Sequence, residues 1–316
     1  MDRLRRIRRC MLFVPATRPA LLDKALATGA DAVCIDLEDS VADQGKAEAR
    51  ASAMALLRTI GEHSAGEPLQ EQAKLNEATE IILRINQPLT PIGMEDLVAV
   101  CDLDCPPHSL LLPKIDEPQH VTQVVGQLAR AASERGWDTI PALIPTIETV
   151  RGLGAVMQIA ACSPSVDALF FGGIDLAHEL GAVPEWEPLL HARSRTIHAA
   201  ALNRIPTIDT PRLELDAPDQ LDGECAAARA LGFCGKAAIH PNQVPIVLSA
   251  FSPSKEEVDR ARRIVAAHEE REEGVFKLDG LMVDRPVIEA AKRTLRLAAH
   301  PHHSRETGSA GQAGVR

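Results

Sequence analysis

Residues 168–181, ALFFGGIDLAHELG, show most directly how this chain folds. Four apolar residues stand in succession, as in a strand whose two faces are both buried in a parallel sheet. Two glycines follow, and Asp175 comes shortly after them, ahead of a segment with a helical pattern. The stretch predicts a strand that leads into a helix, with a carboxylate at the carboxyl end of the strand.

The same alternation of apolar runs and helical segments continues from Met11 to about Ala250. One helical segment has Pro19 at its start and Gly29 at its end. Repeated strand–helix units with eight strands predict an α/β fold of the TIM (β/α)8 barrel type. A doubly wound open sheet is the alternative, but the glycine fingerprint of a dinucleotide site is absent after the first run. The predicted strands are residues 11–16, 31–38, 80–86, 109–115, 140–148, 168–176, 205–210 and 235–241.

The composition argues against several functional classes. The 316 residues carry a net charge of −10 with 3% aromatic residues and no tyrosine, so no nucleic-acid partner is expected. No run of about eighteen apolar residues occurs, so no membrane-spanning helix is predicted. The apolar run after the arginine-rich residues 1–10 is too short for a signal peptide. Seven cysteines scattered through apolar segments fit reduced thiols, and we expect a cytoplasmic protein.

Three regions are predicted along the chain. Residues 1–252 form the catalytic barrel, and residues 253–299 form a charge-rich helical appendage with a helix that opens at Pro286. Residues 300–316 are poor in apolar side chains and are predicted to be disordered. Within the barrel, the polar residues 61–80 are predicted to be the end of a helix and a surface connection.

Charged and polar residues gather at the predicted strand ends. In a parallel barrel these ends surround one open mouth, where the reactive groups lie. Each residue taken alone is most simply a solvated loop residue or a helix N-cap. Taken together, they place acidic and basic groups around one site. The residues are Asp36, Glu38, Asp39, Arg84, Asn86, Lys114, Glu148, Asp175 and His240.

Glu148 and Asp175 end adjacent predicted strands, which brings two carboxylates together and predicts a Mg²⁺ site. Gly172 and Gly173 are expected to let the backbone approach a ligand there. Arg84 is suited to gripping a substrate carboxylate with two parallel hydrogen bonds. A salt bridge from Arg84 to the acidic cluster of the second strand is the alternative.

Eight motifs follow one another along the chain: LFVPATRP, DAVCIDLEDSV, LRIN, LLLPKI, IPTIET, FGGIDLAHELG, GFCGKAAIHPNQV and LDGLMVDRP. In this order they resemble the citrate lyase β-subunit-like family of acyl-CoA lyases, part of the HpcH/HpaI aldolase/citrate lyase group. The resemblance extends over about residues 10–298.

The resemblance implies a Mg²⁺-binding TIM barrel that makes or breaks a carbon–carbon bond between a 2-oxo acid and acetyl-CoA. It places the metal on Glu148 and Asp175 and the acid on Arg84 and Glu148. It assigns an acid/base role to Asp284, contributed by a neighbouring subunit, and it suggests a homotrimer. Arg18 and Lys114 are predicted to contact CoA phosphates or the acidic cluster of the second strand.

This chemistry is consistent with the residues present. Cleavage of a 3-hydroxyacyl-CoA removes the hydroxyl proton and leaves an enolate of the thioester, and Mg²⁺ can lower the hydroxyl pKa by chelating the hydroxyl and the adjacent carboxylate. Asp284 follows an apolar stretch that is expected to raise its pKa, so it is the candidate for protonating the enolate. Its alternative role is to cap the helix that opens at Pro286. His240 is assigned a structural role in preference to catalysis.

Citramalyl-CoA is the favoured substrate, and malyl-CoA and citryl-CoA are the other candidates. One rival function is a CoA-independent class II pyruvate aldolase, although that chemistry has no need of the extra acid in the C-terminal motif. Another rival is a non-catalytic or accessory role, such as the β subunit of a citrate lyase complex.

Overall fold

The structure, a computed structural model, describes residues 6–64, 79–271 and 274–299. These residues belong to two compact units that divide between Ser252 and Pro253. Most of the predicted surface connection after residue 61 and all of the predicted disordered tail lie outside the described residues.

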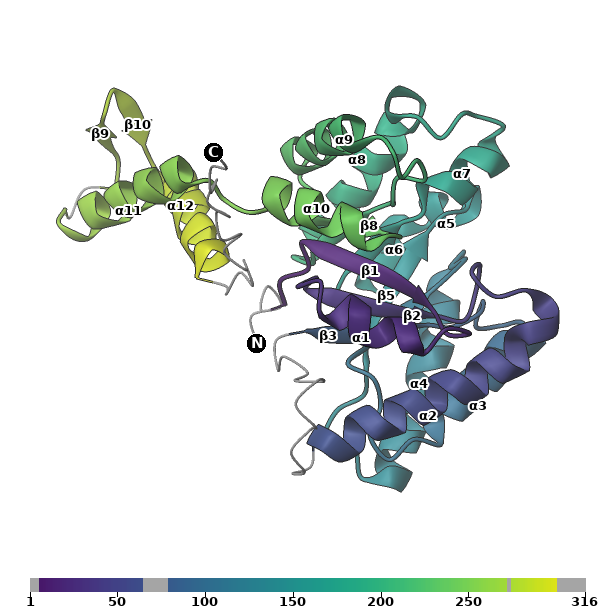
Figure 1. Ribbon diagram of the computed structural model, residues 1–316. Helices are drawn as coiled ribbons and strands as arrows, with labels where there is room; N and C mark the ends of the chain where they lie inside the picture. The colour runs from purple at the N-terminus through teal and green to yellow at the C-terminus, as the bar shows by residue number, and fades with distance from the viewer. Residues whose placement is uncertain (1–5, 65–78, 272–273, 300–316) are drawn as a thin grey trace, which may run out of the picture. The chain divides into compact units, whose positions relative to one another are not determined.

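Eight parallel strands close into a barrel in the first unit, which confirms the predicted TIM barrel (Figure 1). The strands pair in the order in which they occur in the chain, and β8 completes the ring by pairing with β1. Their bounds are β1 Cys10–Pro15, β2 Ala32–Asp36, β3 Glu80–Arg84, β4 Ser109–Leu112, β5 Ala142–Ile147, β6 Leu169–Phe171, β7 Thr207–Asp209 and β8 Gly235–Ala238.

A helix follows every strand of the barrel, and β5 and β6 are each followed by two. Among the described residues, no helix is both long enough and apolar enough to cross a membrane. The helices are α1 Ala20–Leu26, α2 Lys46–Ser64, α3 Pro91–Cys101, α4 Pro118–Arg135, α5 Val150–Gly154, α6 Val156–Ala161, α7 Gly173–Leu180, α8 Trp186–Leu202, α9 Pro218–Leu231 and α10 Val244–Phe251.

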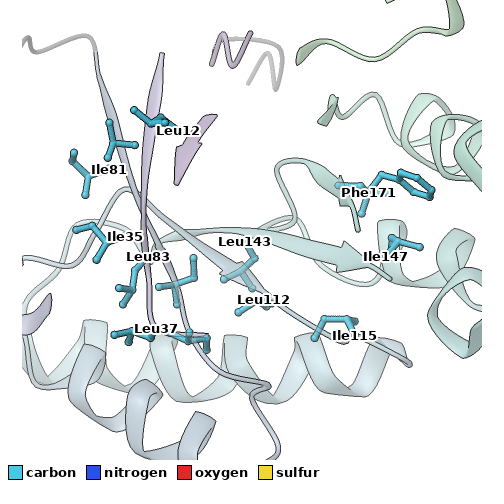
Figure 2. Packing of buried hydrophobic residues seen from close by; sticks show 14 of the residues in the cluster. Leu12, Ile35, Leu37, Ile81, Leu83, Leu112, Ile115, Leu143, Ile147 and Phe171 are labelled. Carbon is cyan, nitrogen blue, oxygen red and sulfur yellow. The ribbon is translucent and has the colours of Figure 1, made fainter. Parts of the chain in front are cut away.

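Alternate side chains of each strand point into the barrel or out toward the helices. The outward layer contains Leu12, Ile35, Leu83 and Leu112, which pack into the larger apolar cluster (Figure 2). Both faces of the strands are therefore buried, which explains why the strands are apolar at successive positions. The smaller interior cluster draws on all eight strands and contains Met11, Ala32, Cys34, Ile82, Leu111, Ile144, Phe170, Ile208 and Ala237.

A network of ion pairs links residues at the amino-terminal ends of the strands. Arg8 is 1% exposed and donates to both carboxylate oxygens of Glu80, at 2.5 and 2.9 Å. Arg8 also donates to Asp167 at 2.6 Å, and Arg6 and Ser109 donate to Glu80. Burial alone would raise the pKa of Glu80, but the hydrogen bonds and charge of Arg8 lower it to about 2. Arg6 and Arg8, which belong to the arginine-rich start of the chain, therefore contribute to the structure of the barrel.

The second unit is built from two helices and a hairpin: α11 Lys255–Glu269, β9 Phe276–Leu278, β10 Leu281–Val283 and α12 Arg285–Ala298. Its predicted helical character is confirmed. Asp279 and Gly280 form the two-residue turn, both with positive φ, as a tight hairpin requires. The unit has an apolar core of its own around Ile264, Phe276 and Val283.

Candidate active site

The interior faces of the strands continue into a cavity at the carboxyl end of the barrel. Phe13, Asp36 and Arg84 stand two residues beyond Met11, Cys34 and Ile82 of the interior cluster, so the two-residue period of a strand aims them into the same space. The cavity has a volume of about 340 Å³. Its lining residues are Phe13, Pro15, Asp36, Asp39, Ser40, Arg84, Glu148, Phe170, Gly172, Ile174, Asp175, Thr210, Pro211, Leu213 and Ile239.

Arg84 and Asp36 face each other across the β2–β3 pair, where they are register partners. Arg84 Nε donates to Asp36 Oδ1 at 2.6 Å, and Nη2 donates to Oδ2 at 2.7 Å. Burial alone would raise the pKa of Asp36, but the hydrogen bonds and charge of Arg84 hold it below its usual value. The main-chain N–H groups of Glu38 and Ser40 also donate to Asp36, so this carboxylate is rigidly held.

The remaining guanidinium nitrogen of Arg84 has two further acidic neighbours. Nη1 donates to Asp39 Oδ2 at 2.9 Å and lies 2.9 Å from Glu38 Oε2. The Arg84 guanidinium also lies 4.9 Å above the ring of Phe13. The predicted salt bridge to the acidic cluster of the second strand is therefore present. Asp39, whose side chain is 54% exposed, is the one of these three acids that solvent reaches most freely.

Glu148 follows β5 and is 4% exposed. Its Oε1 accepts a hydrogen bond of 2.6 Å from the main-chain N–H of Lys114. A Cβ added to Gly172 would lie 2.4 Å from Glu148 Cβ and 2.5 Å from Oε2, so only glycine leaves room for this side chain. Burial, together with the negative charges of Glu38 and Asp175, raises the pKa of Glu148 to about 8.

Asp175 lines the same cavity but does not lie on a strand. We predicted a strand over residues 168–176, whereas β6 ends at Phe171 and α7 begins at Gly173. That prediction was wrong because the glycine pair ends the strand early. Asp175 therefore stands in the first turn of α7, where the partial positive charge of a helix N-terminus favours a carboxylate.

Glu148 and Asp175 provide a donor set that fits Mg²⁺. Both are carboxylates on one cavity, and the negative charge of Asp175 is among the causes of the raised pKa of Glu148. In the described part of the chain, Glu148 Oε2 and the carboxylate of Asp175 accept no hydrogen bond. Mg²⁺ prefers oxygen ligands of this kind. With two of them from the protein, water or substrate oxygens would take its other octahedral positions.

The other predicted residues have different surroundings. Lys114 Nζ donates to Glu38 Oε1 at 2.7 Å, so it contacts the acidic cluster. Arg18 is exposed in the loop after β1, and its side chain makes no ion pair within the described ranges. Asp284 caps α12 in the second unit and accepts a hydrogen bond from Val287 N at 3.3 Å. His240 accepts a hydrogen bond from Asn242 N at 3.2 Å, in agreement with its predicted structural role.

The apolar walls of the cavity were missed at the sequence level. Phe13 and Phe170 stack edge to face with ring centroids 5.9 Å apart. Ile174, Leu213 and Ile239 complete the apolar lining. For the residues on strands, the signal was the two-residue period that extends the interior cluster toward the mouth. Leu213 lies in a loop after β7, and no periodic pattern marks it.

Comparison with protein families gives two matches. The HpcH/HpaI aldolase/citrate lyase family matches residues 9–241, which includes all eight strands. The family described as C–C bond lyase of the TIM-barrel fold matches residues 183–300, which includes the second unit up to the end of α12.

Curated relatives and solved structures agree with the family matches. Human mitochondrial citramalyl-CoA lyase is 29% identical, with 92% of this chain and 85% of the relative covered. Citrate lyase subunit beta of Escherichia coli strain K12 is 32% identical, with 94% of this chain and 95% of the relative covered. The crystal structure of protein CitE from Mycobacterium tuberculosis, in complex with magnesium, acetoacetate and coenzyme A, is 31% identical. The TM-score is 0.71, and the match covers 93% of this chain and 99% of the CitE chain.

Proposed function

The chain belongs to the HpcH/HpaI aldolase/citrate lyase family, and from this premise we propose that it is a Mg²⁺-dependent acyl-CoA lyase. The reaction cleaves a 3-hydroxyacyl-CoA into acetyl-CoA and a 2-oxo acid. Relatives named citramalyl-CoA lyase, citrate lyase subunit beta and L-malyl-CoA/beta-methylmalyl-CoA lyase support an enzyme of this type.

The observation that carries the proposal is the position of Glu148 and Asp175 on one cavity that also contains Arg84. Two buried or half-buried carboxylates beside each other need a cation, and the M. tuberculosis relative was crystallised with magnesium. When bound by these carboxylates, Mg²⁺ supplies Lewis acidity toward the hydroxyl and carboxylate oxygens of the substrate.

Arg84 is proposed to hold the substrate carboxylate. Its Nε and Nη2 are fixed by Asp36, so the end that can be exchanged is Nη1, now shared by Asp39 and Glu38. The substrate carboxylate would take the place of the exposed Asp39 at Nη1. Phe13, stacked beneath the guanidinium, keeps its plane in position during this exchange.

Asp284 is proposed as the acid that protonates the acetyl-CoA enolate, contributed by a neighbouring subunit of a homotrimer. It is half-buried at the start of α12, beside the buried Val283. Its capping hydrogen bond uses Oδ1 and leaves Oδ2 for a proton transfer. Arg18 is exposed, and its main-chain N–H donates at 3.0 Å to the carbonyl oxygen of Pro15, which lines the cavity. It is proposed to contact the CoA phosphates.

Citramalyl-CoA is the substrate that the charges of the cavity favour. Among the described residues that line it, Arg84 is the only Lys or Arg, while Asp36, Asp39, Glu148 and Asp175 are acidic. The second free carboxylate of citryl-CoA would therefore find no cation of its own. A methyl group can contact the apolar wall, and it gains about 1 kcal/mol over the hydrogen of malyl-CoA.

The test offers purified protein citramalyl-, malyl- and citryl-CoA with Mg²⁺ and follows the release of acetyl-CoA. We expect cleavage of citramalyl-CoA, loss of activity with EDTA, and recovery with excess Mg²⁺. Activity that persists in EDTA would reject the metal mechanism.

Cleavage of pyruvate aldols without CoA would instead support a class II aldolase. Inactivity toward every thioester would support the second candidate, a citrate lyase β subunit that needs its complex, which the E. coli relative suggests.

The seven cysteines are all unpaired, which supports the expected cytoplasmic location.

A further inference from the structure

We propose that Lys114 is a positioning residue, which fixes the carboxylate of Glu148 through its own main-chain N–H. The backbone of Lys114 has a left-handed conformation, and hydrogen bonding by its side chain stabilises that conformation. The hydrogen bond from Lys114 to Glu148 is independent of the proposed function. Only its expected effect on Mg²⁺ affinity rests on that function.

The backbone of Lys114 is the first observation. Its φ is +51°, and only two other non-glycine residues, Arg204 and Asp279, have positive φ in the described part of the chain. A residue with a Cβ adopts this conformation at a cost, and such residues are common at functional sites. Lys114 stands two residues after the end of β4, at the carboxyl end of the barrel where the candidate site lies.

The second observation is the hydrogen bond that accompanies this conformation. With the backbone in this conformation, the Lys114 N–H donates to Glu148 Oε1, at the end of β5, at 2.6 Å. On the other side of Glu148 lies Gly172, which has no side chain and lets Oε2 come close to the backbone. Glu148 is thus confined between the end of β4 and the end of β6, so its orientation does not depend on a bound ligand.

The side chain of Lys114 explains why this residue is not a glycine. Its Nζ donates to Glu38 Oε1 at 2.7 Å, and Glu38 Oε2 lies 2.9 Å from Arg84 Nη1. Gln87 Nε2 also donates to the Lys114 carbonyl oxygen at 3.4 Å. These contacts hold both ends of the residue and offset the cost of its left-handed backbone. The ammonium is also absent from the lining of the cavity, which argues for a supporting role.

The first test compares Lys114→Gly with Lys114→Val, because both lose the ammonium and retain the N–H. Glycine adopts positive φ freely, whereas a β-branched residue there is strongly disfavoured. Calorimetric titration with MgCl₂ alone should show binding by Lys114→Val that is weaker than binding by Lys114→Gly by about 10–100-fold, the range for residues that orient metal ligands. Equal affinities of the two variants would overturn the proposal.

Lys114→Ala serves the same comparison if the valine variant does not fold, and its affinity should lie between those of the other two. Circular dichroism and thermal unfolding establish that each variant is folded before titration. Lys114→Asn, which tolerates the left-handed conformation, should behave like Lys114→Gly and so restore binding relative to valine.

The second test needs no metal. Site-resolved amide hydrogen exchange of the Lys114 N–H should be faster in Glu148→Ala than in the unmodified protein, because the acceptor has been removed. Asp175→Ala is the matched control, since it removes a carboxylate of the same cavity, whereas the hydrogen bond of this amide goes to Glu148. Equal exchange in the two variants would show that the amide does not hold Glu148.

The two tests separate this inference from the proposed function. An unmodified protein that binds no Mg²⁺ would refute the metal-dependent function, and hydrogen exchange would still decide whether Lys114 orients Glu148. An unmodified protein that binds Mg²⁺, with equal affinities in the glycine and valine variants, would refute only the positioning role.

Discussion

Arg84 and Asp36 form a two-pronged ion pair that fixes the guanidinium plane, with Nε and Nη2 donating at 2.6 and 2.7 Å. Both residues line the cavity, and Asp36 is only 1% exposed, whereas Nη1 of Arg84 is paired with the largely exposed Asp39. Two partners of Arg84 thus differ in kind: Asp36 holds it permanently, whereas Asp39 reaches it from a largely exposed position. This difference decides what each aspartate does when substrate binds.

Asp39→Asn should lower KM for the hydroxyacyl-CoA by about 1.4- to 5-fold and leave kcat nearly unchanged. Exposed ion pairs are worth about 0.2–1 kcal/mol, and the substrate carboxylate no longer has to displace one. Steady-state kinetics at saturating Mg²⁺ provide the measurement. A higher KM in this variant would mean that Asp39 helps to bind substrate.

Asp36→Asn is the contrasting variant, because it removes the buried half of the same network. Leaving Arg84 without its fixed partner should lower the free energy of unfolding by about 3–5 kcal/mol and reduce turnover. Urea unfolding measures the first effect. Equal stability losses in the two aspartate variants would contradict the division between a fixed and an exchangeable partner.

Gly172→Ala should displace Glu148, since the added methyl would lie within 2.5 Å of two of its atoms. Overpacking of this kind costs about 1–3 kcal/mol of stability. Mg²⁺ affinity and turnover should fall by an order of magnitude or more, about what is seen when a metal ligand loses its support. Titration with MgCl₂ and the acetyl-CoA assay measure these effects.

Gly126→Ala is its control, because a Cβ at this position in α4 would meet nothing within 4 Å. Alanine in a helix interior is expected to raise stability by about 0.5–1 kcal/mol with unchanged activity. If Gly172→Ala behaved like this control, Glu148 would not occupy the position that the structure gives it.

The fold was predictable from sequence because its signal is repeated eight times. Apolar runs of the right length, separated by helical segments, leave few architectures other than a closed parallel barrel. The failure at residues 172–176 has a local cause. Gly173 and Asp175 favour the start of a helix as readily as the end of a strand, and periodicity cannot separate the two over so few residues.

The site was predictable in its components and not in its connections. The positions of Arg84, Glu148 and Asp175 near the predicted strand ends were enough to predict that they lie on one cavity, although Asp175 belongs to α7 and not to a strand. Their roles stay predictions. The ion pair between Asp36 and Arg84 depends on the register between β2 and β3, and no pattern within either strand alone specifies that register. The main-chain contact from Lys114 to Glu148 depends on one backbone angle, and a lysine in the sequence gives no indication of positive φ.

Glu80 should make the barrel sensitive to acid. The ion pair with Arg8 lowers its pKa from 4.5 to about 2, so it stabilises the folded state above pH 4.5 and this contribution is lost as the pH falls toward 2. The shift corresponds to about 3 kcal/mol. Glu80→Gln should lower the free energy of unfolding at pH 7 and flatten its pH dependence between pH 4.5 and 2, as measured by urea unfolding at several pH values.

Glu95→Gln is the matched control, since Glu95 pairs with Arg50 on the surface with its side chain 63% exposed. Its effect should stay within about 1 kcal/mol at every pH. A Glu80 variant with the same slope as the unmodified protein over this range would show that other carboxylates cause the acid unfolding.

Asp284→Asn should suppress turnover by about 10²–10⁴-fold while leaving folding and Mg²⁺ affinity intact. Asparagine is as good an N-cap as aspartate, so it can accept the hydrogen bond from Val287 N and keep the start of α12, but its amide cannot deliver the proton. Asp175→Ala should lose both Mg²⁺ binding and turnover. Titration with MgCl₂, thermal unfolding and the acetyl-CoA assay separate the two variants.

Mixing these two inactive variants tests whether Asp284 acts on a neighbouring subunit. Mixed oligomers, formed by co-expression, contain some sites in which an intact Asp175 on one chain meets an intact Asp284 on another, so part of the activity should return. Each variant oligomerised with itself has no such site and serves as the control. If purification through an affinity tag carried by one variant recovers both chains and activity does not return, Asp284 must act within its own chain or not at all.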